Sequence, residues 1–350
     1  MKQQNPFKKA LREAAKARAC QIYLQVGQPI RWRCRREFTC TDPTPLSIDG
    51  WKAILGAGHS SDRRFDATIV KLDKRRFKAR ITYGDGNCLP YAVLTPILEI
   101  NNAPSITSLD DALMARTGLV FVSGPPMSGR TTLVMQMIRF IRQNRTGSIA
   151  TGELMIEHLL AGDGIFRTSF DFPIDAIECL AADGHDIVYI ESIPDAETFD
   201  AILAAAEDRL VIASWNSSSF ARTLTGLVYD YAGQNSDTRR IRQRLAVVFR
   251  GFIGTELIPT SPDSRYGRRY GQILAREIVV ANEAMIGNIR DGDFHLVDQT
   301  IIGGRNAGML PFNDDLRQLL GLNTIDAATF AEFQHQHHVE IAPSRVITEL

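Results

Sequence analysis

Apolar and polar residues alternate through most of the first hundred positions. Ile22, Leu24 and Val26 share one face of a predicted strand over residues 20–26, because side chains on a strand point alternately to its two sides. The same alternation predicts further strands over residues 30–38, 67–72, 77–83 and 91–95. Amphipathic patterns predict helices over residues 5–19 and 51–55. The pattern therefore indicates a small α+β module that ends near residue 100.

From residue 117 onward, short apolar runs take turns with helical spacings. Strands are predicted over residues 119–122, 148–151, 186–190, 210–214 and 272–280. Helices are predicted after residue 132, over residues 195–207 and 239–252, and from residue 294 onward. This order is typical of a parallel sheet whose strands are joined by crossover helices. The sequence thus predicts two domains, residues 1–100 and 110–350, joined by a linker over residues 101–109.

The first strand of the second domain leads into a glycine-rich loop that precedes a helix. This stretch contains the residues expected of a phosphate-binding P-loop, namely Gly124, Ser128, Gly129, Arg130, Thr131 and Thr132. Glycines let backbone N–H groups approach phosphate oxygens, and the helix N-terminus adds a partial positive charge. Thr131 is placed to offer its hydroxyl to Mg²⁺. A glycine-rich turn without a ligand is the alternative, but the order of strand, loop and helix favours a P-loop.

One position of this P-loop departs from the usual pattern, which has lysine where Arg130 stands. The guanidinium keeps the positive charge, but it is a wide planar fork, so the exchange is not conservative at a tight phosphate site. It could also fold back onto the carboxylate of Glu153 or Glu191 and fill the place of the nucleotide phosphates. We therefore interpret the chain as a P-loop fold with a damaged P-loop.

Composition narrows the class of protein only a little. The 350 residues, 44% of them apolar, suit two globular domains, and the formal net charge of +0 gives no global attraction to nucleic acid. The five cysteines lack the spacing of a zinc site or a disulfide framework, which indicates a reducing compartment. No stretch has the length of a membrane span or the form of a signal peptide. We expect a cytoplasmic protein.

A histidine-rich tract lies near the C-terminus and contains His335, His337 and His338. A metal site there is one reading, and an exposed helix end is the favoured one. We predict no metal site built from the chain's own residues alone.

The order of these motifs resembles that of the hexameric secretion ATPases of type IV pilus systems, most closely the pilus retraction subgroup. Residues 19–33 and 76–80 are similar to two strand regions of the N-terminal module of that family. Residues 276–279, 284–291 and 303–309 are similar to parts of its C-terminal domain. The resemblance implies a P-loop (RecA-like) NTPase domain of the α/β class, preceded by a small α+β (PAS-like) domain. It also implies subunits that assemble as a ring.

The acidic motif of the family is altered in this chain. Glu153 and Glu157 match its two glutamates, whereas Leu154 stands at its aspartate. Two arginines that the family carries farther along are replaced by Glu178 and Ala182. The resemblance therefore implies an acidic box that has lost part of its charge.

The catalytic positions of the family differ as well. Its catalytic glutamate aligns with Ser192, while Glu191 lies one residue earlier on a strand whose side chains alternate in direction. Glu191 could act as the base only if the strand end slips by one residue. The histidine of a later motif is Asn216 here. Glu191, Ser192 and Asn216 are thus the degenerate catalytic positions.

These losses affect the same reaction. Phosphoryl transfer to water depends on positioned charges, a metal ion and an oriented water. We therefore predict no efficient ATP hydrolysis, with ATP and Mg²⁺ bound weakly or not at all.

Three functions are compatible with these observations. The favoured one is a structural or regulatory subunit of a type IV pilus or related secretion machine, either as a homo-oligomeric ring or docked on an active ATPase. Such a subunit would work beside the inner-membrane platform protein of the machine. The alternative is an active hexameric motor for pilus retraction that uses Arg130 and Glu191. Nucleic-acid binding through the basic N-terminus is the least favoured, because few aromatic residues accompany the basic ones.

Overall fold

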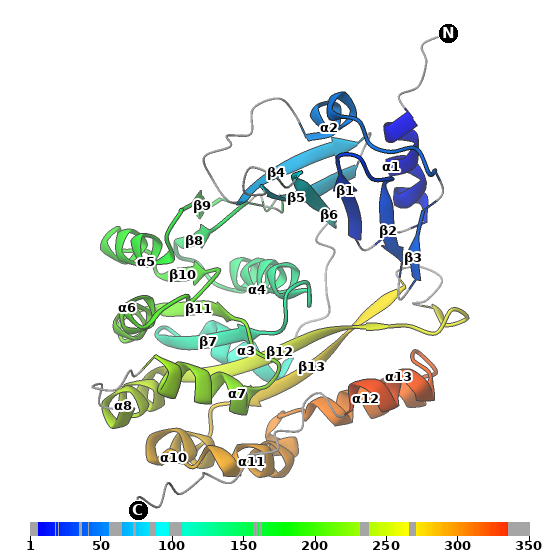
Figure 1. Cartoon of the computed structure of the whole chain (residues 1–350). Helices are drawn as coiled ribbons and strands as arrows, with labels where there is room; N and C mark the ends of the chain where they lie inside the picture. The colour runs from blue at the N-terminus through cyan, green and yellow to red at the C-terminus, as the bar shows by residue number, and fades with distance from the viewer. Residues whose placement is uncertain are drawn as a thin grey trace, which may run out of the picture. The chain divides into compact units, whose positions relative to one another are not determined.

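The computed structural model describes residues 6–17, 19, 21–34, 37–40, 42–55, 65–72, 75–83, 89–97, 107–156, 158, 160, 163–231, 238–265 and 271–334. The chain divides into two units, each with a sheet of its own (Figure 1). The first unit holds Met1–Ile100, Met155–Leu159 and Pro259–Ile273, and the second unit holds the rest. The domain limits drawn from the sequence stay a prediction.

The first unit is built on a six-stranded antiparallel sheet. Its elements are α1 (Pro6–Lys16), β1 (Gln21–Gln25), β2 (Arg31–Cys34), β3 (Glu37–Thr39), α2 (Ile48–Leu55), β4 (Phe65–Leu72), β5 (Arg75–Thr82) and β6 (Tyr91–Ile97). The strand order is β3-β2-β1-β6-β5-β4. Alternate strand residues such as Ile22, Trp32 and Phe77 share a core with Leu11 of α1 and Trp51 of α2. This arrangement confirms the predicted α+β module.

The strand predicted over residues 30–38 is instead a hairpin of β2 and β3. Cys34 pairs with Glu37, so the chain reverses between them. The hairpin places Phe38 opposite Arg33, on the side away from Trp32, and Phe38 is 52% exposed. A simple alternation would have put Phe38 in the core with Trp32. The prediction failed because an alternating pattern does not reveal where a strand reverses.

The second unit is built on a seven-stranded sheet. Its main elements are α3 (Asp110–Met114), β7 (Gly118–Ser123), α4 (Arg130–Asn144), β8 (Ile149–Glu153), β9 (Ile165–Ser169), α5 (Pro173–Ala182), β10 (Ile187–Ile190), α6 (Ala196–Ala206), β11 (Leu210–Trp215), α7 (Phe220–Thr225), α8 (Thr238–Val248), β12 (Phe249–Pro259), β13 (Gln272–Val280), α10 (Glu283–Asp291), α11 (Val297–Gly303), α12 (Phe312–Gly321) and α13 (Ala327–Phe333). The strand order is β13-β12-β7-β11-β10-β8-β9.

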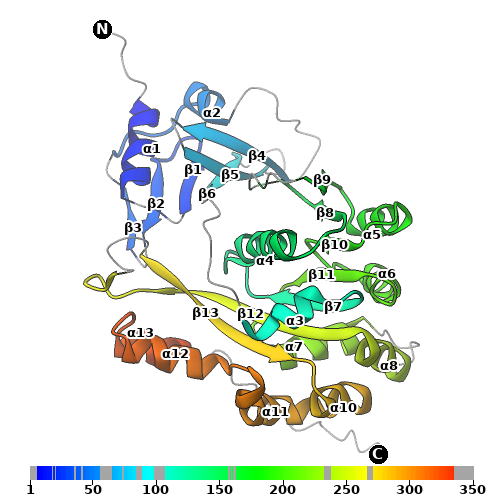
Figure 2. The same ribbon diagram turned by 180° about the vertical axis from the view of Figure 1, so that it is seen from behind.

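Six neighbouring strands of this sheet, from β12 to β9, run parallel. Helices α5, α6 and α8 share one core with alternate residues of the central strands, including Phe121, Val188 and Val211. Figures 1 and 2 show α4 on the other face of the sheet. Because both faces are covered, β7 and β10 are buried along their whole length, which is why they read as continuous apolar runs. The carboxyl ends of the six parallel strands lie at the same edge of the sheet.

The helix predicted over residues 239–252 ends earlier than expected. Helix α8 stops at Val248, and β12 begins at Phe249 and pairs with β7. Phe249 and Phe252 keep a helical spacing, but Gly251 favours neither state by itself. A Cβ at Gly251 would lie 2.7 Å from a methyl carbon of Leu109, so the glycine lets Leu109 pack closely against the strand. Tertiary packing therefore overrode the local pattern.

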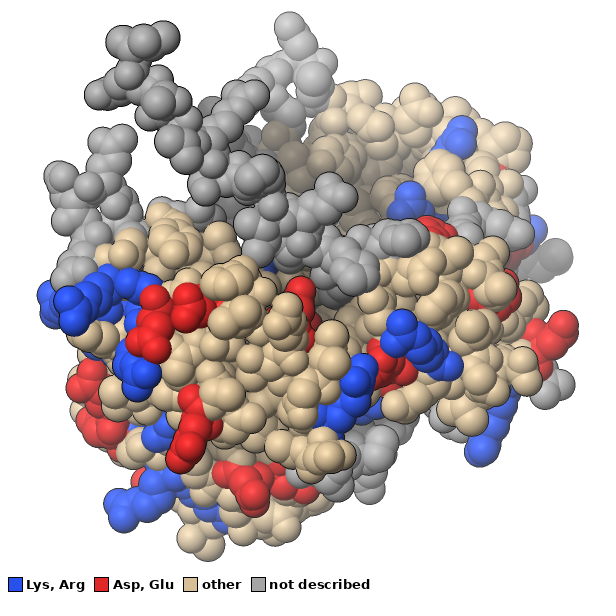
Figure 3. Space-filling model, turned by 90° about the horizontal axis from the view of Figure 1, so that it is seen from below, with Lys and Arg blue, Asp and Glu red and all other residues tan. Residues whose placement is uncertain are grey.

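Two further features of the described residues are the length of the helices and the distribution of surface charge. Within the described residues, no helix is long and apolar enough to cross a membrane. In Figure 3, the coloured part of the surface intersperses basic and acidic side chains. Arg305 and Arg317 each form an ion pair with Asp314 at 2.6 Å. The histidine tract at residues 335–338 lies outside the described residues.

Candidate phosphate-binding site

The predicted P-loop connects the buried strand β7 to helix α4. Gly129 is the N-cap of α4 and has a φ of 91°, in the left-handed region that glycine adopts without strain. At Gly124 a Cβ would collide with the carbonyl oxygen of Thr255 and the hydroxyl of Ser128. Both glycines are therefore required by the local geometry, as expected of a loop that packs closely and then starts a helix.

A chain of hydroxyl groups braces this loop against β12. The Ser128 and Thr255 hydroxyl oxygens lie 2.9 Å apart, and the Thr255 hydroxyl donates to the Ser123 carbonyl oxygen at 3.0 Å. All three residues are buried. These hydrogen bonds tie the start of the loop to β12.

Arg130 is the first residue of α4, and its guanidinium points back over the strand ends. It donates to the carbonyl oxygen of Trp215, at the end of β11, at 2.6 Å. Burial lowers the pKa of Arg130, while electrostatic interactions with Tyr189 and Glu191 act in the opposite direction. The expectation of a hydrogen bond to an acid is thus corrected, because a backbone carbonyl is the acceptor. Glu191 influences Arg130 only through its charge.

Thr131 and Thr132 follow in the first turn of α4. Both are half-buried. The structure therefore keeps the two hydroxyls in the first helical turn, beside the loop, where the sequence placed them.

Glu153 lies at the end of β8 and is bound by an arginine that the sequence did not single out. Arg167 of β9 donates its Nε to Oε1 at 2.9 Å, and its Nη2 donates to Oε1 at 2.7 Å and to Oε2 at 2.6 Å. The hydroxyl of Thr151 donates to Oε1 at 2.6 Å. The side chains of Arg167 and Glu153 are only 9% and 0% exposed. The expectation that Glu153 would hold Arg130 is therefore wrong.

The sheet register explains this pair. Thr151 lies directly opposite Arg167 in the parallel pairing of β8 and β9. Residues two apart on a strand share a face, so Glu153 is on the same side as Thr151 and within reach of the arginine. The forked geometry of arginine suits a carboxylate, and it makes this contact stronger than a single hydrogen bond.

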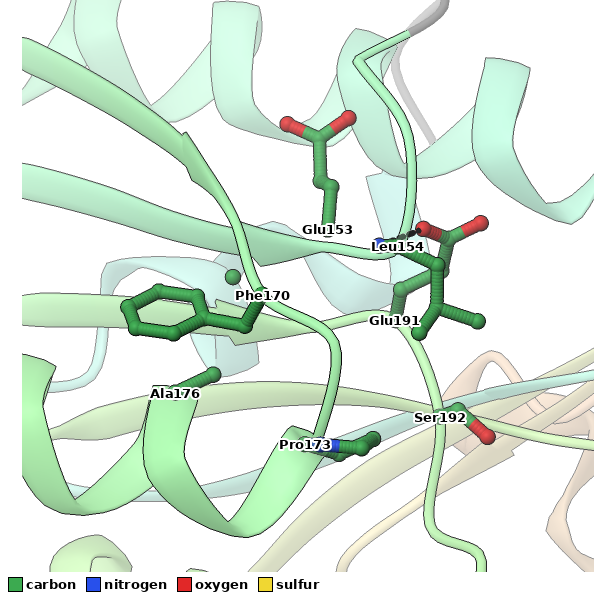
Figure 4. Close-up of a pocket in the computed structure, with 8 residues that line it drawn as sticks. Glu153, Leu154, Phe170, Pro173, Ala176, Glu191 and Ser192 are labelled. Atoms are coloured by element: carbon green, nitrogen blue, oxygen red, sulfur yellow. Dashed lines mark hydrogen bonds between the residues drawn. The ribbon is translucent and has the colours of Figure 1, made fainter. Parts of the chain in front are cut away.

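Glu191 and Ser192 follow β10 and line a shallow hollow beside β8 (Figure 4). The lining residues are Gly152, Glu153, Leu154, Phe170, Pro173, Ala176, Glu191 and Ser192. The Glu191 carboxylate accepts the backbone N–H of Leu154 at 2.6 Å. In Figure 4, Glu191 and Ser192 point in different directions, as expected of consecutive residues at a strand end.

The remaining predicted residues fall into two groups. Asn216 directly follows β11 and is exposed. Glu157 lies outside the described residues. No group of three or more His, Cys, Asp or Glu side chains that could hold a metal ion occurs within the part of the chain that the structure describes. The structure thus brings Glu153, Glu191 and Ser192 around one hollow, with Arg130 within electrostatic reach of Glu191.

Two residues that contribute to this edge were missed from the sequence. Arg167 lies on β9 (Ile165–Ser169), the edge strand of the sheet, whose residues are half-buried or exposed, so the residue pattern gave no signal that it pairs with an acid. Tyr189 is fully buried on β10, where burial raises the pKa of its phenol well above its ordinary value. Its hydroxyl lies 3.3 Å from that of Ser214.

The chain was compared with known proteins and solved structures. No protein-family model matches it. It is 22% identical to the uncharacterized protein YggR of Escherichia coli (strain K12) over 319 residues, which cover 86% of this chain and 94% of YggR. It is also 22% identical to the type IV pilus ATPase PilU of Pseudomonas aeruginosa over 333 residues, covering 89% and 84% of the two chains.

Solved structures share the fold over almost the whole length. The crystal structure of the pilus retraction motor PilT with bound ADP has a TM-score of 0.69 and 22% identity, and the match covers 93% of this chain and 96% of PilT. The ATPase DotB of Yersinia pseudotuberculosis has a TM-score of 0.73 and 19% identity, with 93% and 92% covered. The fold is therefore that of a P-loop, RecA-like ATPase, as predicted. The sequence relatives include type IV pilus and twitching motility ATPases, in agreement with the family resemblance seen in the sequence.

Proposed function

We propose that this chain is a catalytically degenerate member of the pilus retraction ATPase family. The main support for this proposal is the hydrogen bonding of Glu191, which directly precedes the position of the family's catalytic base in the sequence. Its carboxylate accepts the N–H of Leu154 at 2.6 Å, and the next residue, which aligns with the catalytic glutamate of the family, is Ser192. A general base contributes about 10²- to 10⁴-fold to a rate, so its loss removes most of the turnover.

A degenerate member keeps the frame of the family and serves as a structural or regulatory subunit of a type IV pilus or related secretion machine. It acts either in a ring of identical subunits or together with an active ATPase, in the cytoplasm beside the inner-membrane platform of the machine. The N-terminal unit is PAS-like in this proposal. Nucleotide binds weakly or not at all, and nucleic acid is not a partner.

The test is an ATPase assay on the full chain and on Glu191→Gln. We expect both proteins to release phosphate no faster than a protein-free background, because Glu191 is already committed to a backbone N–H. Glu197→Gln is the matched control, since Glu197 is an exposed glutamate in the first turn of α6. Arg130→Lys should not restore turnover either, because Ser192 still lacks a carboxylate.

One observation favours the alternative of an active motor. The charge of Glu191 acts on Arg130, so this carboxylate lies on the side of the P-loop. If Glu191 releases Leu154 when nucleotide binds, it could serve as the base. Robust turnover that Glu191→Gln abolishes, and that Glu197→Gln leaves intact, would establish this motor and overturn the proposed degeneracy.

A further inference from the structure

The acidic side of the P-loop site does not fit a divalent cation. Mg²⁺ requires oxygen ligands in near-octahedral geometry, and proteins supply one or two carboxylates beside the phosphates of the substrate. The two described carboxylates at this edge are Glu153 and Glu191. Glu153 accepts hydrogen bonds from protein donors on both of its oxygens, so it would have to give up a partner before it could receive a metal ion, and Glu191 already uses Oε2 to accept the N–H of Leu154.

Glu153 is the less available of the two carboxylates for binding a divalent cation. It takes four donor contacts at 2.6–2.9 Å, three from the Arg167 guanidinium and one from the Thr151 hydroxyl. The pair is almost fully buried, and removing one partner of a buried ion pair leaves an uncompensated charge in a low dielectric. A cation of charge +2 placed beside Arg167 would also meet direct repulsion.

The positive charge at this edge is already supplied by the chain itself. Arg130 stands at the start of α4, and Arg167 neutralises the acid at the end of β8. We propose that the P-loop of this chain takes a phosphate-bearing ligand as the free anion, with Arg167 in the role that a divalent cation has toward the acidic box. The inference goes beyond the proposed function, in which any nucleotide binding is weak, by naming the form in which a phosphate-bearing ligand is bound at the P-loop.

The primary experiment is a binding titration of ATP to the unmodified full chain, with EDTA in one arm and excess Mg²⁺ in the other. The ionic strength is matched, because salt screens anion binding. We expect the two dissociation constants to agree within about threefold, since the carboxylate of Glu153 is already bound by Arg167 and Thr151 and is not open to Mg²⁺. Tenfold or greater tightening by Mg²⁺ overturns the inference. Absence of binding in both arms also overturns it, while the lack of ATPase activity that defines the proposed function would stand.

A second experiment uses Glu153→Gln, for which the two views predict opposite signs. Removing the carboxylate releases the Arg167 guanidinium toward an anion, so ATP should bind about threefold or more tightly, with or without Mg²⁺. If Glu153 instead helps to hold a metal ion, the same change weakens binding in the Mg²⁺ arm alone. Glu197→Gln is again the control, because it removes an equal charge from an exposed position and should change neither arm.

Discussion

Two buried glutamates in the second unit are accommodated in different ways. Glu153, at the carboxyl end of β8, is matched by a forked arginine and a hydroxyl. Glu277, in the middle of β13, accepts the N–H of Phe220 at 2.8 Å. Burial raises the pKa of Glu277 to about 8; the Phe220 N–H opposes this rise, and the charge of Asp298 adds to it. A buried carboxylate is thus made tolerable in two ways, by a partner charge or by taking up a proton.

This difference is informative about the roles of the two residues. A paired glutamate stays committed to its partner, which is why Glu153 is unsuited to a metal ion. Glu277 lies on β13 with its carboxyl group at the first residue of α7, and its charge state changes near pH 8. The same residue type therefore acts as a fixed structural ion pair in one place and as a pH-sensitive group in the other.

The largest expected effect concerns Glu277 and pH. Its folded pKa of about 8 lies above the ordinary value of 4.5, so the folded state binds the proton more tightly than the unfolded state. The stabilisation is complete below pH 4.5 and is lost as pH rises through 8. The rise from 4.5 to about 8 corresponds to a change in the free energy of unfolding of about 5 kcal/mol.

The measurement is urea denaturation of the parent and of Glu277→Gln at several pH values between 5 and 8.5. The parent should lose stability relative to Glu277→Gln as pH rises, because the amide cannot ionise. Glu197→Gln, an exposed glutamate, should follow the parent. Parallel curves for the parent and Glu277→Gln would show that Glu277 does not titrate in this range.

A somewhat smaller effect is expected at the paired glutamate. Arg167→Met removes the partner of Glu153 and leaves a buried charge uncompensated, which should lower the free energy of unfolding by about 3 kcal/mol or more. Denaturant titration at pH 7 measures this loss. The double variant Arg167→Met, Glu153→Met should recover most of it, because no charge remains in the site. A double variant as unstable as the single one would mean that packing, and not the ion pair, explains the loss.

The sequence was a good guide to the frame of the second unit and a poor one to its polar edge. The run Leu119–Val122 predicts a buried strand, because burial on both faces requires apolar residues at every position. Gly124 and Gly129 could also be predicted as loop residues, since few other residues fit their backbone conformation. The frame follows from local rules, and the family resemblance added the expectation of a RecA-like domain.

Partner choice at the edge depends on register and on backbone atoms, which no residue pattern encodes. Arg167 meets Glu153 only because β9 pairs with β8 in one register. Arg130 binds a carbonyl of Trp215, and every residue has such a group. The same reasoning explains Phe38, whose exposed position depends on where the β2–β3 hairpin turns. Contacts of this kind become visible only in three dimensions.

The smallest expected effect extends the comparison to an exposed carboxylate. Asp195 is the N-cap of α6 and accepts the N–H of Thr198 at 2.8 Å, much as Glu277 accepts that of Phe220. Because Asp195 is exposed, it keeps its hydration and needs no partner charge. Asp195→Ala should therefore cost only about 1 kcal/mol of unfolding free energy, the usual value of a lost cap. Asp195→Asn should retain most of the stability, since its side-chain oxygen still accepts the bond.

Glu178→Ala, an exposed change on α5 without a capping role, should stay within about 0.5 kcal/mol of the parent. Thermal denaturation of the three variants at pH 7 measures these differences, and an equal loss for Asp195→Asn and Asp195→Ala would mean that charge, and not the cap, stabilises α6.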